Sequence, residues 1–233
     1  MTVSRRFTAE FAGTAFLLAA VVGSGIMGDR LSGGNVAIAL LANSIATGAA
    51  LVALILTFGP ISGAHFNPAV TLADAVLRGT AWRDVPAYLV AQLAGALCGV
   101  FSAHLMFGLQ LVQVSQNVRA GGAQVFSEFV ATFGLLSVIW GCVRRRPEAV
   151  PWAVGLYITG AYWFTASTSF ANPAVTMARA LTNTFAGIRP ADVPAFAAAQ
   201  LVGAGAATML FRWLLPTLQR SAADVLVPHE RAS

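Results

Sequence analysis

Long apolar segments alternate with short polar ones along most of the chain. A membrane-spanning helix needs roughly 20 predominantly apolar residues to cross a hydrocarbon core of about 30 Å. Six segments have this character: about 7–27, 36–58, 84–108, 123–143, 150–168 and 192–215. Two shorter helical segments, about 67–78 and 172–182, can cross only half of the bilayer, so we expect each to enter the membrane and return. The pattern predicts an all-α integral membrane protein with six transmembrane helices and two re-entrant half-helices.

The two halves of the chain repeat one another. Three short sequences occur twice: Asn-Pro-Ala-Val-Thr from Asn67 and Asn172, Glu-Phe-x-x-Thr from Glu10 and Glu128, and Ala-Gln-Leu-x-Gly-Ala from Ala91 and Ala199. Each repeat contains three spans, an odd number, so the second repeat is expected to insert upside down. We therefore predict one channel-like domain over residues 1–215, with repeats at about 6–110 and 123–215, followed by a polar cytoplasmic tail at 216–233.

Both half-helices have the sequence of a helix start. The residues concerned are Asn67, Pro68 and Ala69 in the first copy and Asn172, Pro173 and Ala174 in the second. Asparagine is a good N-cap, and proline fits the first helical position because the N–H it lacks would have no intrahelical partner. Two helix N-termini meeting near the bilayer centre would disfavour cations there. The loops before them are irregular backbone at membrane depth, which is tolerated only when it is buried or lines a wet cavity.

Composition and charge support this environment. Hydrophobic residues make up 57% of the chain and charged residues 10%, compared with roughly 25% charged residues in soluble domains, and the mean hydropathy is +0.72. The net charge is +5, but the arginines are scattered between apolar segments without a basic stripe, so the lipid bilayer rather than nucleic acid is the expected surrounding partner. An N-terminus inside the cell leaves only Arg30, Arg119, Arg179 and Arg189 on the outer side. This bias predicts a multi-pass protein of the cell (inner) membrane with both termini cytoplasmic.

Catalytic chemistry has no support in the sequence. Cys98 and Cys142 lack metal or redox spacing, and neither a nucleophile with a base nor a phosphate-binding glycine loop is present. We expect no enzyme activity, no cofactor and no metal.

The segment Ser62-Gly63-Ala64-His65-Phe66-Asn67-Pro68-Ala69-Val70, together with the second Asn-Pro-Ala, resembles the signatures of the major intrinsic proteins, the aquaporins and glycerol facilitators. The resemblance extends over about residues 6–215. It implies a homotetramer with a pore through each protomer for small neutral solutes such as water and glycerol. It also implies that Gly63, Ala64 and His65 in one loop, and Thr168 and Phe170 in the other, line the pore.

Family spacing from the two asparagines identifies the narrow outer filter as Thr47, Gly160, Ser169 and Val175. Water-selective members usually have Phe, His, a small residue and Arg at these positions, and glycerol facilitators have Trp, Gly, Phe and Arg. This chain lacks both the first aromatic residue and the arginine. The resemblance therefore predicts a wide, neutral constriction that passes polyols and metalloid hydroxides such as arsenous acid, with or without water. A strict water channel and an ion-coupled transporter with inverted repeats are the alternatives.

Four further residues have two interpretations each. Arg179 lies one turn after Val175; we expect its side chain to extend to the outer membrane interface, and a displaced pore-mouth charge is the alternative. Glu10 and Glu128 are expected to accept hydrogen bonds from the re-entrant loops, although intramembrane acids also indicate proton or ion sites. His65 resembles the family's pore-lining histidine, and bracing of its loop is the alternative.

Overall fold

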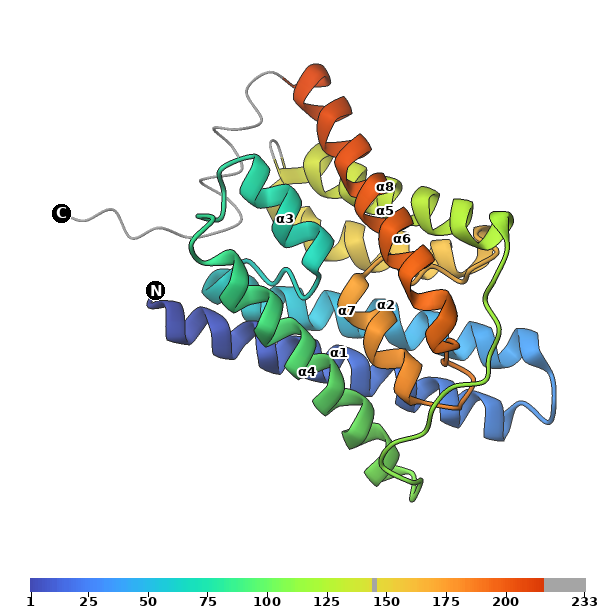
Figure 1. Ribbon diagram of the computed structural model, residues 1–233. Helices are drawn as coiled ribbons and strands as arrows, with labels where there is room; N and C mark the ends of the chain where they lie inside the picture. Colours follow the sequence, from blue (N-terminus) through green and yellow to red (C-terminus); the bar gives the residue numbers. More distant parts are fainter. Residues whose placement is uncertain (144–145, 216–233) are drawn as a thin grey trace.

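A computed structural model describes residues 1–143 and 146–215, and all regular structure in these residues is helical (Figure 1). The elements are α1 (Val3–Leu31), α2 (Val36–Ser62), α3 (Pro68–Val76), α4 (Val85–Met106), α5 (Gly122–Val143), η1 (Pro147–Ala149), α6 (Val150–Phe164), α7 (Pro173–Ala178), η2 (Arg179–Leu181), η3 (Pro190–Asp192) and α8 (Val193–Leu214). Their order and type agree with the all-α prediction of six long helices and two half-helices. The predicted tail, 216–233, lies outside the described residues, as do four arginines on the side predicted to be cytoplasmic: Arg144, Arg145, Arg220 and Arg231.

Five of these helices are long and apolar enough to cross a membrane: α1, α2, α4, α5 and α8. The sixth, α6, has 15 residues and is shorter than the predicted span of 150–168. It ends at Phe164 because the backbone of Thr165 is extended, with φ −110° and ψ 136°. At about 1.5 Å per residue α6 spans roughly 22 Å, and η1 in front of it adds about 6 Å, which together approach the thickness of the hydrocarbon core.

The half-helices begin where the sequence predicts and end earlier. Asn67 caps α3 and Asn172 caps α7, each with proline at the first helical position. The first half-helix ends at Val76 rather than residue 78, because the backbone of Arg78 has a positive φ of 67°. The second has six α-helical residues and then tightens into the 3₁₀ turn η2.

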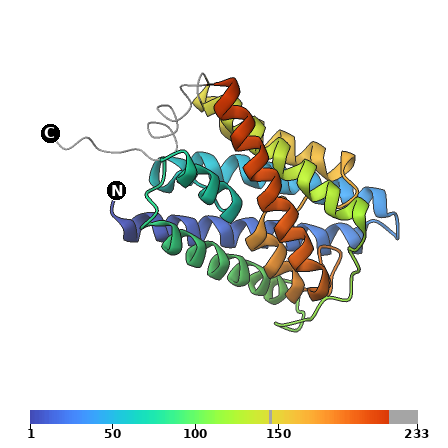
Figure 2. The same ribbon diagram turned by 45° about the horizontal axis from the view of Figure 1, so that its top comes forward.

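The helices pack as two matching groups. In the first half α1 packs against α2 and α4, in the second α5 packs against α6 and α8, and contacts between α2 and α6 join the halves. The closest approaches are equivalent: Gly95 faces the carbonyl oxygen of Phe11, and Gly203 faces that of Phe129. The start of α1 and the end of α8 lie at the same end of the molecule, as six crossings require (Figures 1 and 2).

The α1–α4 contact should be intolerant of even one extra carbon. A Cβ at Gly95 would overlap the Phe11 carbonyl, whereas a Cβ at Gly205 meets no atom within 4 Å. We expect Gly95→Ala to destabilise the fold by about 1–3 kcal/mol through overpacking. Gly205→Ala is the matched control and should be neutral or slightly stabilising, because alanine is the better helix former. Thermal unfolding in detergent measures both; equal midpoints for the two variants would contradict the packing argument.

Candidate functional site

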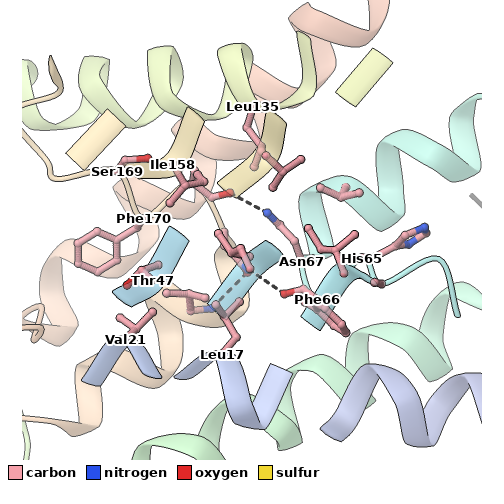
Figure 3. Close-up of a pocket in the computed structure, with 18 of the residues that line it drawn as sticks. Leu17, Val21, Thr47, His65, Phe66, Asn67, Leu135, Ile158, Ser169 and Phe170 are labelled. Carbon is pink, nitrogen blue, oxygen red and sulfur yellow. Dashed lines mark hydrogen bonds between the residues drawn. The ribbon is translucent and has the colours of Figure 1, made fainter. Parts of the chain in front are cut away.

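The N-termini of the two half-helices are tied to each other through their capping asparagines. Asn67 Oδ1 accepts the N–H of Ala69 at 2.9 Å, and Asn67 Nδ2 donates to the Ala171 carbonyl at 2.8 Å. Asn172 repeats the arrangement, since its Nδ2 donates to the Phe66 carbonyl at 2.7 Å and its Oδ1 accepts N–H groups of the first turn of α7 (Figure 3). Each amide nitrogen carries two hydrogens and uses one in this exchange. The second N–H of each asparagine is therefore free to meet a solute.

Two buried glutamates hold the loops that lead to these asparagines. Glu10 accepts the backbone N–H groups of His65 at 2.9 Å and Phe66 at 2.7 Å. Glu128 accepts those of Phe170 and Ala171, both at 2.9 Å. A buried backbone N–H without a partner costs about 1–3 kcal/mol. The carboxylates supply partners that the irregular backbone cannot provide itself.

A glutamine completes each of these networks. Gln92 Nε2 lies 2.8 Å from Glu10 and 2.9 Å from Thr71, and Gln200 Nε2 lies 2.6 Å from Glu128 and 2.8 Å from Thr176. These are the repeated residues of the two halves. The residues that repeat in the two halves of the sequence therefore make equivalent hydrogen bonds around the two loops.

The direction of these N–H groups also sets the direction of the loop carbonyls. In a trans peptide the N–H of one residue and the C=O of the preceding residue point in opposite directions. The bonds from His65 and Phe66 to Glu10 consequently turn the carbonyls of Ala64 and His65 away from that carboxylate, toward the side of the loop that lines the cavity. The same holds for Ser169 and Phe170 opposite Glu128.

Both loops contain non-glycine residues with positive φ. These are Ala64, Phe66, Thr168, Ser169 and Ala171, with φ between 48° and 61°. Left-handed conformation costs an L-residue roughly 1–2 kcal/mol. The hydrogen bonds to Glu10 and Glu128 offset this strain and hold the carbonyls in place.

A cavity of about 80 Å³ passes both asparagines and extends along α2 and α6. A single water needs about 10–15 Å³ of such space, so the cavity accommodates several. Its two sides differ chemically. The long helices contribute mostly hydrocarbon, including Leu17, Leu51, Leu135 and Ile158, and the two loops with Asn67 and Asn172 contribute the amides and carbonyls.

The predicted filter residues divide into two groups. Thr47, Ser169 and Val175 line the cavity, and Thr47 and Ser169 lie with Phe170 toward one end of it (Figure 3). Gly160 is not among the lining residues; it lies on an exposed side of α6, with no atom within 4 Å of a Cβ built on it. Gly160 and Tyr162 are two residues apart, which turns them about 200° from each other around an α-helix, so Gly160 faces away from the cavity when Tyr162 faces it.

Tyr162, which the sequence did not single out, lines the cavity beside Thr47. It is buried, lines the cavity, and its hydroxyl lies 3.2 Å from Thr47 Oγ1. The signal was present in the four-residue period of Val150, Val154, Ile158 and Tyr162, all of which line the cavity. A period of four along α6 identifies one face of a helix.

Arg179 does not extend to the membrane interface, so that prediction is wrong. Its residue is 2% exposed, it lines the cavity, and its Nε donates to the Ala186 carbonyl. The guanidinium carbon lies 3.4 Å from the centre of the Phe170 ring. The end of the cavity beside Phe170 therefore carries a cation, contrary to the neutral constriction inferred from Val175.

The loop residues predicted to line the pore also differ in their positions. Gly63, Ala64 and Phe170 line the cavity, whereas Thr168 does not. His65 lines it too, but its imidazole is fully buried and lies 3.1 Å from Thr71 Oγ1, and Figure 3 shows the ring turned away from the other labelled side chains. The imidazole therefore braces the loop.

A helical bundle whose two half-helices meet end to end beside a cavity is the architecture of a transmembrane channel. The chain belongs to the major intrinsic protein family, whose model matches residues 1–149 and 145–233. It is therefore a multi-pass membrane channel for small solutes and not an enzyme.

Several relatives are similar over much of the chain. Aquaglyceroporin AqpS of Rhizobium meliloti (strain 1021) is 58% identical over 213 residues, which cover 91% of each chain. Aquaporin NIP3-1 of Oryza sativa subsp. japonica is 36% identical over 68% of this chain and 52% of its own length. The X-ray structure of the aquaglyceroporin from Plasmodium falciparum covers 94% of this chain and 100% of that chain, with a TM-score of 0.73 and 21% identity. At that identity the structural likeness shows the fold.

Neutralising a loop-holding glutamate should loosen the pore wall. Glu128→Gln replaces a carboxylate that accepts three hydrogen bonds with an amide that has one acceptor oxygen, so we expect a loss of about 1.5–3 kcal/mol in stability and reduced solute flux. Glu148→Gln is the control, because Glu148 is exposed and accepts no side-chain hydrogen bond from the loop among the described residues. Thermal unfolding and proteoliposome swelling measure the two effects. Unchanged flux and stability in Glu128→Gln would contradict the role of the carboxylate.

Proposed function

We propose that this channel conducts polyol-sized neutral solutes, with glycerol and metalloid hydroxides such as arsenous acid as representatives. The observation that carries the proposal is the two-sided cavity, with hydrocarbon along one side and amide donors and loop carbonyls along the other. A polyol presents C–H groups on one side and hydroxyls on the other, so it can bury the first while bonding the second. A metalloid hydroxide has the same size range and hydroxyl pattern. The name of the AqpS relative, an aquaglyceroporin, supports the same solute class.

The proposed pore runs between Asn67 and Asn172 within a single channel domain, residues 1–215, built of repeats at about 6–110 and 123–215. Its outer constriction is formed by Thr47, Tyr162, Ser169 and Val175. The carbonyl groups of the two loops form its polar track. Family resemblance supports a homotetramer in the cell membrane, and the distribution of arginines supports cytoplasmic termini.

An ion-coupled transporter is the weaker alternative. It would need an acidic group free to bind and release an ion, and Glu10 and Glu128 first suggested one. Both carboxylates accept several hydrogen bonds from loop backbone and glutamine, which ties them to the fold. Flux should therefore follow the solute gradient alone.

Val175 tests the width of the constriction. Val175→Arg puts a long side chain at a lining position one turn from Arg179 and narrows the opening, so we expect glycerol and arsenous acid permeability to fall at least about tenfold more than that of the smaller water molecule. Val175→Leu controls for added volume without charge and should change the solute ratio less. Stopped-flow swelling of proteoliposomes at matched protein content measures the ratios. Unchanged ratios in Val175→Arg would refute the proposed constriction.

Tyr162 tests which residue of α6 forms the constriction. Tyr162→Ala removes the ring beside Thr47, so permeability to glycerol should rise relative to water by about two- to tenfold, because the opening widens. Gly160→Ala is the matched control on the same helix and should leave the ratio as it is, since its added carbon meets open space. The opposite result, with Gly160→Ala sensitive and Tyr162→Ala silent, would restore the assignment made from spacing.

A further inference from the structure

Arg179 presents hydrogen-bond donors that no group among the described residues uses. Its Nε is bonded to the Ala186 carbonyl and its guanidinium stacks on the Phe170 ring. Its two terminal nitrogens make no hydrogen bond to any group in the part of the chain that the structure describes, although the residue is only 2% exposed and lines the cavity. A guanidinium fixed by its Nε and its flat face leaves its forked end as the part that can meet a solute.

Arg119 brings a second cation to the same ring. It belongs to the connection between α4 and α5, and its guanidinium carbon lies 4.9 Å from the centre of Phe170. Its Nε donates to the Gly187 carbonyl at 2.8 Å and its Nη1 to the Ser167 carbonyl at 3.1 Å.

The α4–α5 connection is itself tied down beside η2. Backbone bonds join Gln113 to Leu181 and Ser115 to Ala180, which anchors the segment that leads to Arg119. The position of this second cation is therefore set by the fold and not by a free side chain.

Neither arginine has a carboxylate partner among residues 1–143 and 146–215: the ion pairs there are made by Arg6, His65, Arg83 and Arg189. The nearby acids are already engaged. Asp192 pairs with Arg189 and accepts the backbone N–H of Arg119, and Glu128 holds the loop N–H groups. Buried charge without a counter-charge is costly, and stacking on Phe170 offsets only part of that cost.

We propose that the outer end of the cavity binds a small oxyanion of carboxylate size on the terminal nitrogens of Arg179, with Arg119 adding attraction from the other guanidinium. Two parallel N–H donors match the two oxygens of a carboxylate, which a single point charge would not do. The hydrocarbon wall deeper in the cavity opposes passage of the charged form, so the bound anion stays at the mouth. The inference rests on the proposed function in one respect: if this cavity is the path of neutral solutes, an anion bound at its mouth blocks their passage.

Formate is the probe, with chloride as the comparison. We expect external sodium formate at pH 7.5 to lower glycerol permeability of wild-type proteoliposomes at least about threefold with saturation, and sodium chloride of equal concentration to have less than half that effect. Arg179→Gln should abolish the formate effect and Arg119→Gln should weaken it severalfold. Arg30→Gln is the control, since Arg30 is exposed and outside the cavity, and its formate sensitivity should equal that of wild type.

Three results would overturn the site: no saturable effect of formate on the wild type, an equal effect of chloride, or a full formate effect in Arg179→Gln. If Arg179→Gln does not fold, Arg179→Lys decides the question, because lysine keeps the charge but lacks the two parallel N–H donors of a guanidinium. Inhibition by formate should then weaken severalfold more than inhibition by chloride. Line broadening of 13C-formate by the purified channel measures binding without flux. Formate binding in a channel that does not pass glycerol would refute the proposed function and leave the anion site standing. Glycerol flux without formate binding would refute the anion site and leave the proposed function standing.

Discussion

The structure depends on satisfying two stretches of irregular backbone at membrane depth. Each loop is non-helical up to the start of its half-helix, so its backbone N–H groups have no helical partners. Lipid offers these N–H groups no partner either. Glu10 and Glu128 provide the partners from within the bundle, each from a long helix of its own repeat. The orientation of the loop carbonyls, and with it the polar part of the cavity wall, follows from these contacts.

The same contacts explain why the cavity has two unlike sides. A carboxylate behind each loop turns the carbonyls forward, while the facing helices contribute mostly aliphatic side chains such as Leu51 and Leu135. The asparagines join the two polar tracks, because each donates to the carbonyl that precedes the other. A continuous polar strip opposite hydrocarbon is suited to solutes that carry both kinds of surface.

Charge at the outer end is arranged differently from the family pattern that the sequence resembles. Val175 stands where most members carry arginine, yet a guanidinium still reaches the cavity from Arg179, one turn further along. The tight 3₁₀ turn η2 and the Phe170 ring hold it there, and the α4–α5 connection brings Arg119 to the same ring. The hydroxyl of Tyr162 lies 3.2 Å from Thr47 Oγ1, so an aromatic residue lines the cavity beside the threonine.

The sequence by itself determined the parts that rest on local or periodic signals. Apolar segment length gives the helices, asparagine followed by proline gives the two helix starts, and the repeated Glu-Phe and Gln-Leu pairs give the inverted duplication. Which side chains line the cavity together depends on tertiary packing. Family spacing from Asn172 points to Gly160, whereas Tyr162 is the residue of this part of α6 that lines the cavity. The direction of Arg179 likewise depends on Ala186 and Phe170, whose approach to it no spacing along the chain could reveal.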